Sequence, residues 1–205
     1  MTEAVLLASS ITDRCLQQIA DAAEPLAGSL QRAVLLPGPR NPHLLAAHDA
    51  ARMLALQLRL LRMVWGGTGG TLPARRLPDL LRGAPGWERV RLDLAALPAR
   101  TTLGVARARV VLAALLAAME ALPSGGTISI GRASDGAIEI GIAGAGAVWP
   151  AALPTLLTDA AAAAEAAKAG EHGAAAVLAL LAAGLSVKVT LENGRRKPGR
   201  LRIGR

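Results

Sequence analysis

The stretch from Asn41 to Gly70, NPHLLAAHDAARMLALQLRLLRMVWGGTGG, constrains the fold of this chain more than any other segment. Asn41 is a good N-cap, Pro42 suits the first helical position, and glycines follow the last apolar residues, so both ends carry helix-boundary residues. Between these ends, apolar residues recur at alternating spacings of three and four: Leu44, Ala47, Ala51, Leu54, Leu58, Leu61 and Trp65. Such a stripe is typical of a bundle helix, which needs facing helices to cover it.

A second helix is expected upstream, over about residues 2–31, because the same apolar period is present there. Its apolar positions are Ile11, Cys15, Ile19, Ala22 and Leu26. Two antiparallel helices with broad apolar faces cannot bury both faces against each other. We therefore predict a four-helix bundle made by two copies of residues 1–70, with packing against the C-terminal part of one chain as the alternative.

The character of the sequence changes after residue 70. Residues 71–86 form a connection punctuated by proline and arginine, and the rest alternates between strand-like and helix-like periods. The expected elements are a strand at 89–94, a helix at 101–122, a hairpin of 127–131 with 137–142, further helices interrupted near 170–173, and strands at 185–191 and 200–203. This order predicts a mixed sheet covered on one face by helices, an α/β sandwich over residues 87–205, and an α+β class for the whole chain.

Composition and charge indicate the cellular compartment and exclude some classes of partner. The single cysteine, Cys15, excludes an internal disulfide framework, and no signal-peptide pattern is present. The longest uncharged apolar stretch, Gly173 to Val187, is shorter than the roughly 20 residues that a membrane span needs. The net charge of +8 depends on six basic residues within positions 195–205, without interleaved aromatic residues for base stacking. We predict a cytoplasmic protein that binds neither membrane nor nucleic acid.

Several segments together resemble one known family. They are Leu7-Ala-Ser, Arg52-Met-Leu-Ala, Leu60-Leu-Arg-Met-Val-Trp-Gly, Arg109-Val-Val-Leu and Ala121-Leu-Pro-Ser-Gly-Gly-Thr-Ile-Ser-Ile. With these segments the chain is similar to the ChpT-type histidine phosphotransferases of alphaproteobacterial phosphorelays. The resemblance implies a homodimer in two-component signalling, with a histidine kinase-like dimerisation bundle and then a degenerate ATP-binding (GHKL-like) sandwich. It also implies that the partners are receiver domains of response regulators or hybrid kinases.

The resemblance also locates the phosphate acceptor. The family signature L-C-H-D aligns without gaps with Ile11-Thr12-Asp13-Arg14, so Asp13 stands where the family has its acceptor histidine. A carboxylate lacks the nitrogen nucleophile of imidazole. The resemblance therefore implies a surface around Asp13, Leu16 and Gln17 that docks receiver domains without phosphoacceptor activity.

Two alternatives stay open. His48 is followed by Asp49 on the second helix, which permits an active phosphotransferase that uses His48, although a packed bundle histidine explains this position as well. The other alternative is a binding module that uses the basic C-terminal hairpin, Arg195 to Arg205, to hold an anionic partner. His43 and His172 are expected to be plain surface residues.

The residues do not favour a cofactor. The resemblance matches Ala113 to the position of a magnesium-binding asparagine, and the loop Ala143-Gly-Ala-Gly has no aspartate for adenine. The single cysteine and the three histidines have no partners at metal-ligand spacing. We therefore expect neither nucleotide nor metal.

Overall fold

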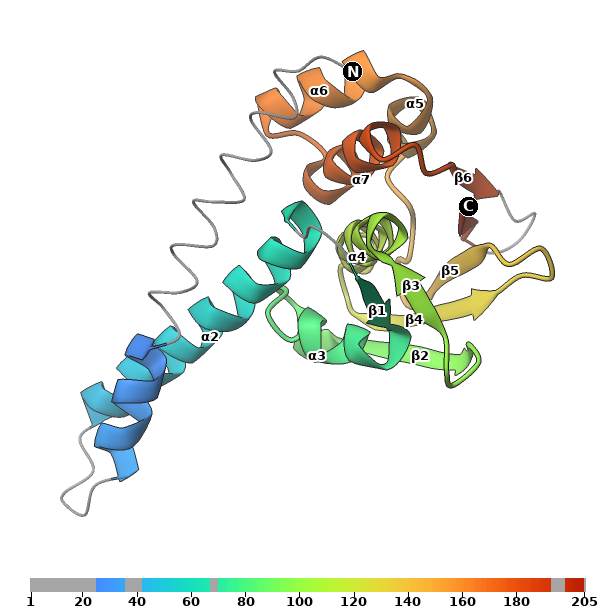
Figure 1. Cartoon of the computed structure of the whole chain (residues 1–205). Coiled ribbons are helices and arrows are strands. Elements are labelled where there is room, and N and C mark those ends of the chain that lie inside the picture. Colours follow the sequence, from blue (N-terminus) through green and yellow to red (C-terminus); the bar gives the residue numbers. More distant parts are fainter. Residues whose placement is uncertain (1–24, 36–41, 67–69, 193–197, 205) are drawn as a thin grey trace. The chain divides into compact units, whose positions relative to one another are not determined.

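The computed structural model describes residues 25–35, 42–66, 70–192 and 198–204 (Figure 1). The chain divides into two compact units, one of Met1–Gly67 with Asp79–Pro85 and one of Thr68–Pro78 with Gly86–Arg205. Among the described helices, none is long and apolar enough to cross a bilayer.

The first unit contains two helical segments. Residues 25–35 form one of them, and α2, Pro42–Trp65, forms the other (Figure 1). The predicted second helix is confirmed, because α2 begins at the expected proline and ends one residue before Gly66. Proline at the first helical position costs nothing there, since that N–H has no intrahelical partner, and the following glycines favour termination.

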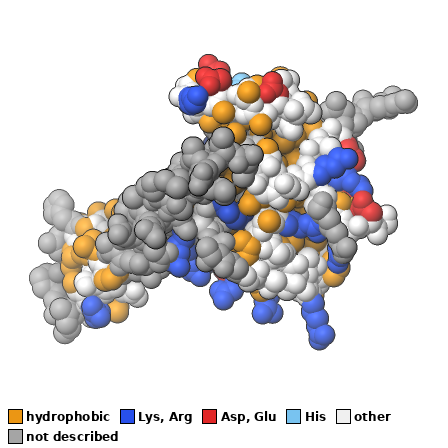
Figure 2. All heavy atoms as spheres, turned by 45° about the horizontal axis from the view of Figure 1, so that its top comes forward, with side chains coloured by type: hydrophobic (Ala, Val, Ile, Leu, Met, Phe, Trp, Pro, Cys, Tyr) orange, Lys and Arg blue, Asp and Glu red, His pale blue; other side chains and the backbone are white. Residues whose placement is uncertain are grey.

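The apolar stripe of α2 is only partly covered within one chain. Ala51 and Leu58 are buried, but Leu54 and Leu61 keep 46% and 37% of their surface exposed. Figure 2 shows hydrophobic side chains at the surface of the first unit, at the left end of the view. One face of α2 therefore remains apolar and accessible in the single chain.

The segment Asp79–Pro85 belongs to the same unit because its backbone approaches α2 closely. A Cβ atom on Gly83 would overlap the carbonyl of Leu56 and would lie 2.7 Å from the amide nitrogen of Gln57. Only glycine fits at this contact, so part of the predicted connection packs on the helix rather than serving as a free linker.

The second unit is built on a five-stranded sheet in the order β2-β4-β5-β7-β6. The strands are β2 Val90–Ala96, β4 Gly126–Arg132, β5 Ile138–Ala143, β6 Val189–Glu192 and β7 Arg200–Ile203. β2 and β4 are parallel, and the other neighbours are antiparallel. The predicted mixed sheet and the predicted hairpin of β4 and β5 are confirmed.

A second, two-stranded sheet pairs β1, Thr71–Pro73, with β3, Thr102–Gly104, in antiparallel orientation. Neither strand was predicted from the sequence, and the helix predicted at 101–122 overlaps β3. The short helix α3, Leu77–Leu81, and the 3-10 turns Ala74–Arg76 and Trp87–Arg89 complete the segment before β2.

Four helices follow β3 in the chain: α4 Val105–Glu120, α5 Leu153–Thr158, α6 Ala160–Ala169 and α7 Gly173–Gly184. α4 packs on β4, β5 and β7, α7 packs along α4, and α5 and α6 pack on α7 (Figure 1). The core between sheet and helices is aliphatic, with Leu112, Leu115, Ile130 and Ile140 almost completely buried. Burial of each such side chain contributes about 1.5–3 kcal/mol. The predicted α+β class, with helices on a mixed sheet, is therefore confirmed.

One predicted strand boundary is wrong. The strand expected from Leu185 begins at Val189, because α7 continues to Gly184 and a turn follows. Ser186 adopts a φ of 54° in this turn, a left-handed conformation that a strand cannot contain.

Candidate functional site

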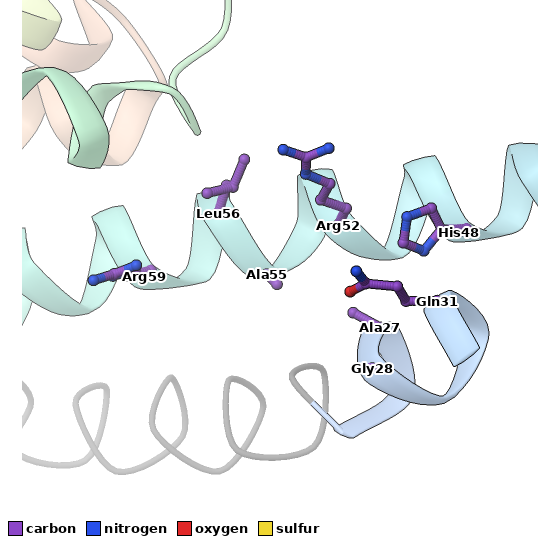
Figure 3. Close-up of a pocket in the computed structure, with 8 residues that line it drawn as sticks. All are labelled: Ala27, Gly28, Gln31, His48, Arg52, Ala55, Leu56 and Arg59. Carbon is purple, nitrogen blue, oxygen red and sulfur yellow. The ribbon is translucent and has the colours of Figure 1, made fainter. Parts of the chain in front are cut away.

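A groove of about 450 Å³ lies in the first unit between residues 25–35 and one face of α2 (Figure 3). Its lining residues are Ala27, Gly28, Gln31, His48, Arg52, Ala55, Leu56 and Arg59. The residues from α2 recur at helical spacing and therefore share one face. Small side chains at Ala27, Gly28 and Ala55 leave the space, while the larger polar side chains supply its chemistry.

That chemistry is basic. His48 is half-buried, and its Nδ1 atom is buried without a hydrogen-bond partner among the described residues. Figure 3 shows the His48 ring and the Gln31 amide facing each other across the groove. Arg52 and Arg59 are exposed, and no aspartate or glutamate is among the lining residues that the structure describes. The groove therefore offers hydrogen-bond donors and positive charge together.

The predicted docking residues Asp13, Leu16 and Gln17 lie outside the described residues, as does Cys15. His48 lies on the second helix, as predicted, and is partly buried there. His172 is exposed and stands at the N-cap position of α7 with a φ of 54°, without a side-chain capping bond.

In the second unit, the position matched to a magnesium-binding asparagine is occupied by Ala113, which is completely buried in α4. Next to this position, α7 packs along α4, and a side chain of α4 contacts the backbone N–H groups in the first turn of α7. The Glu120 carboxylate accepts hydrogen bonds from the backbone N–H of Ala174 at 3.2 and 3.3 Å. A carboxylate there satisfies an unpaired N–H and interacts favourably with the helix dipole.

The glycines of the two neighbouring loops have a packing reason. A Cβ atom on Gly144 would lie 2.5 Å from the carbonyl oxygen of Gly125, and one on Gly126 would overlap the carbonyl of Ala143. The loop before β4 and the loop after β5 therefore approach each other backbone to backbone. The Gly-Gly of the family-like segment Ala121-Leu-Pro-Ser-Gly-Gly permits this approach, which requires no ligand.

An ion-pair network lies on β5, β6 and β7 and the turn before β5. Arg202 pairs with Asp135, with Glu139 at 3.2 Å and with Glu192 at 3.8 Å. The pKa of the Asp135 carboxyl is lowered, first by the hydrogen bond from the Ala137 backbone N–H and next by Arg202. The pKa of the Arg202 guanidinium is raised, chiefly by its hydrogen bond to Asp135.

This network changes the interpretation of the basic C-terminal segment. Arg200 pairs with Glu139 at 3.3 Å, so two of the six basic residues there have acidic partners on the protein itself. The other four, Arg195, Arg196, Lys197 and Arg205, lie outside the described residues.

Among the described residues, no three side chains of histidine, cysteine, aspartate or glutamate cluster as a metal site would need.

The family match concerns the second unit for the most part. A model described as the histidine phosphotransferase C-terminal domain matches residues 75–197. The chain belongs to this family. Histidine phosphotransferases are phosphorelay proteins, so membership makes this a phosphorelay-type protein and confirms the wider family indicated by the sequence.

Several solved structures are similar to this chain in fold. A bacterial phosphotransferase solved at 1.7 Å is 12% identical, with a TM-score of 0.58, over 99% of this chain and 97% of that chain. Full-length ShkA in complex with AMPPNP is 16% identical, with a TM-score of 0.46, over 93% of this chain and 44% of that chain. The histidine kinase domain of a blue-light activated kinase from Erythrobacter litoralis EL346 is 12% identical, with a TM-score of 0.42, over 91% of this chain and 93% of that chain. A search of curated proteins finds no significant match.

The grouping of Arg52 and Arg59 with His48 was not predicted from the sequence, and neither was the place of Gln31 in the groove. A signal was present, because residues 48, 52 and 59 are separated by four and seven positions and so lie on one helical face. The contribution of Gln31 depends on the packing of two helices, which spacing within one helix cannot reveal.

Proposed function

We propose that this protein docks receiver domains in a two-component phosphorelay, on the surface of the first helix around Asp13, Leu16 and Gln17, without accepting a phosphoryl group at position 13. The observation that carries the proposal is an aspartate at the matched acceptor position in a chain that belongs to the histidine phosphotransferase family. In this proposal the protein acts as a competitor or scaffold for receivers rather than as a transfer enzyme.

The chemistry at position 13 explains the distinction. In transfer, an imidazole nitrogen attacks the phosphorus of an aspartyl phosphate, a P–N bond forms, and the receiver carboxylate leaves. The Asp13 carboxylate carries negative charge toward a negatively charged phosphoryl group and has no nitrogen lone pair to offer. Leu16 and Gln17 follow at the i+3 and i+4 positions, so on a helix they share its face, and Leu16 supplies an apolar anchor for a partner.

We assign the docking and dimerisation roles to residues 1–70, joined through residues 71–86 to the GHKL-like sandwich of residues 87–205. The exposed apolar face of α2 supports dimerisation, because Leu54 and Leu61 are seven residues apart and both are exposed. A second copy that covers this face would complete a four-helix bundle. Light scattering should give a dimer for the wild type and a monomer for Leu54→Arg combined with Leu61→Arg, whereas a dimer of the double variant would contradict this interface.

His48 gives a second candidate function. Its half-buried ring lines the same groove as Arg52 and Arg59, and positive charge near the ring would favour a phosphoryl group on an imidazole nitrogen. In that case the protein is an active phosphotransferase with its acceptor on the second helix. No comparable observation favours the basic C-terminal hairpin as a binding module, since Arg200 and Arg202 are paired within the protein.

The test combines binding and transfer. A phosphorylated receiver domain from the same genome is mixed with the wild type, with Asp13→His and with the matched control Asp13→Asn. We expect all three to bind the receiver in calorimetry and only Asp13→His to gain an acid-labile label. Leu16→Arg should abolish binding while leaving the circular dichroism spectrum unchanged.

The other outcomes separate the candidates. Label on the wild type that disappears in His48→Ala would establish the second candidate and overturn the non-catalytic role. Failure of wild type and Asp13→His alike to bind any receiver of that genome would refute the docking proposal. An Asp13→His variant that binds the receiver but gains no label would show that residue 13 does not stand where an imidazole can attack the phosphoryl group.

A further inference from the structure

Strand β2 lies at one end of the five-stranded sheet, and only one of its two edges is paired (Figure 1). On that side β4 pairs with it in a regular register from Val90 to Asp93, after which the register shifts. Among the described residues, no strand lies along the outer edge of β2. Unpaired N–H and C=O groups along such an edge form a template for another strand.

One face of β2 is an apolar row that is incompletely covered. Val90, Leu92 and Leu94 share this face and are only half-buried, whereas Ile128 and Ile130 of the neighbouring strand β4 are buried. The difference arises because α4 packs on β4, β5 and β7, at the centre of the sheet. A further strand beside β2 would cover the remaining apolar surface.

The other face of β2 presents two opposite charges. Arg91 and Asp93 are both exposed, and neither has an ion pair with a described residue. The Oδ1 atom of Asp93 accepts a hydrogen bond from the Ala95 backbone N–H at 2.9 Å, which leaves Oδ2 for another donor. Charges on an edge strand ordinarily discourage pairing with another chain. Here their opposite signs and their spacing make the edge complementary to itself.

This complementarity appears when two copies of β2 are placed antiparallel about a two-fold axis at Leu92. In that register Leu92 lies opposite Leu92 of the second copy, and Val90 lies opposite Leu94. Arg91 of each copy then lies opposite Asp93 of the other. Opposite charges directly across a strand pair are favourable, and like charges are unfavourable.

The neighbouring registers lack this match. A two-fold axis at Arg91 or at Asp93 would place that charged residue opposite its own copy. An axis between two residues would place charged side chains opposite apolar ones, because residues directly opposite share a face. We propose that β2 is a self-association surface, through which two copies of this chain join their sheets with Arg91–Asp93 ion pairs on both sides of Leu92.

This contact lies in the second unit and depends neither on the α2 interface nor on receiver docking. It involves only residues 90–94 of each copy, which is small beside a stable protein interface of about 1,200–2,000 Å². The association is therefore weak, and the α2 interface determines the state that light scattering detects in dilute solution. A covalent trap at low ionic strength suits such a contact, because salt screens exposed ion pairs.

The trap is Leu92→Cys in the full chain, with Cys15→Ser to remove the single natural cysteine. Opposite residues of an antiparallel pair have Cα atoms about 4.5–5.5 Å apart, which a disulfide can bridge. Thr190→Cys is the control, because Thr190 is exposed on β6, the strand at the other end of the sheet. We expect Leu92→Cys to form a covalent dimer under mild oxidation at least about tenfold faster than the control, since pairing raises the local thiol concentration.

Charge exchange on the Leu92→Cys background tests the register. Arg91→Asp places aspartates opposite each other, and Asp93→Arg places arginines opposite each other, so either change should reduce cross-linking to the rate of the control. The two changes together restore opposite charges and should restore the wild-type rate, as should a mixture of the two single variants. Arg100→Asp makes the same change of charge at an exposed residue outside β2 and should leave the rate unchanged.

Equal cross-linking of Leu92→Cys and Thr190→Cys would overturn the proposal, because chance collisions would explain both. Failure of the double exchange and of the mixture to recover cross-linking would overturn it as well, since the charges would then not face each other. A second measurement needs no cysteine and covers the case in which Leu92→Cys does not fold. Sedimentation at high protein concentration should show association of the wild type and of the double exchange but less of Arg91→Asp, and identical behaviour of all three would refute the surface.

Discussion

Replacement of Gly144 by alanine should destabilise the second unit measurably. The new Cβ atom would lie 2.5 Å from the carbonyl oxygen of Gly125, 3.2 Å from Cα of Gly126 and 3.3 Å from Cδ2 of Leu122. Ordinary carbon–oxygen contacts are about 3.3 Å or longer, so the two loops would have to separate by roughly 0.8 Å. Overpacking of this kind typically costs about 1–3 kcal/mol. A central value near 2 kcal/mol should lower the melting temperature of a chain of this size by about 4–8 °C.

The assay is urea unfolding followed by tryptophan fluorescence, to which the buried Trp149 contributes, together with a thermal melt. Gly204→Ala is the control, because its Cβ would meet only Lys188 atoms at the ordinary distances of 3.5 and 3.6 Å. We expect the control to change stability by less than about 0.5 kcal/mol. A melting temperature of Gly144→Ala within 1 °C of wild type, or an equal change in both variants, would refute the close approach of the two loops.

Three further predictions concern single contacts. Trp149→Phe removes a 2.7 Å hydrogen bond from the indole Nε1 to the carbonyl of Gly199, and should lower the free energy of unfolding in urea by about 1–3 kcal/mol; an unchanged value would contradict the bond. Asp159→Ala removes the side chain that accepts from two backbone N–H groups in the first turn of α6, and should cost about 1 kcal/mol, seen as faster amide exchange in α6 but not in the sheet. Because the folded-state pKa of Asp135 is lowered, by the backbone N–H two residues on and by Arg202, its contribution to stability is full above about pH 4 and is lost as the pH falls through that pKa. Asp135→Asn should therefore lose less stability than wild type between about pH 4 and pH 2, and parallel acid limbs would contradict this.

The sequence predicted those elements whose signals are local. The hairpin of β4 and β5 was found because its strands are bounded by glycines and by the turn Ser134-Asp135-Gly136, and α2 was found from its caps and its period. Strands β1 and β3 were missed because three residues contain too few positions to show a period of two, and because their pairing joins segments about 30 residues apart. Val187 was assigned to a strand because a continuous apolar run does not distinguish the end of a buried helix from a strand.

The candidate site was predictable only in part. The position of His48 on the second helix followed from the sequence, but its cationic groove depends on how residues 25–35 pack on α2. The resemblance supplied Asp13, Leu16 and Gln17, and these remain predictions. The sequence showed only that the loop Ala143-Gly-Ala-Gly has no aspartate for adenine, whereas the structure gives Gly144 a packing reason, its close approach to Gly125 and Gly126.

The strand order has a consequence for synthesis on the ribosome. β7 pairs with β5 on one side and with β6 on the other, so β6 joins the sheet only through a strand that is translated after it. Until β7 emerges from the exit tunnel, the nascent chain holds β2, β4 and β5 with an open edge at β5 and with β6 unpaired. Productive folding of this unit is thus tied to the last strand, and a ribosome stalled just before residue 200 would present an incomplete sheet to chaperones.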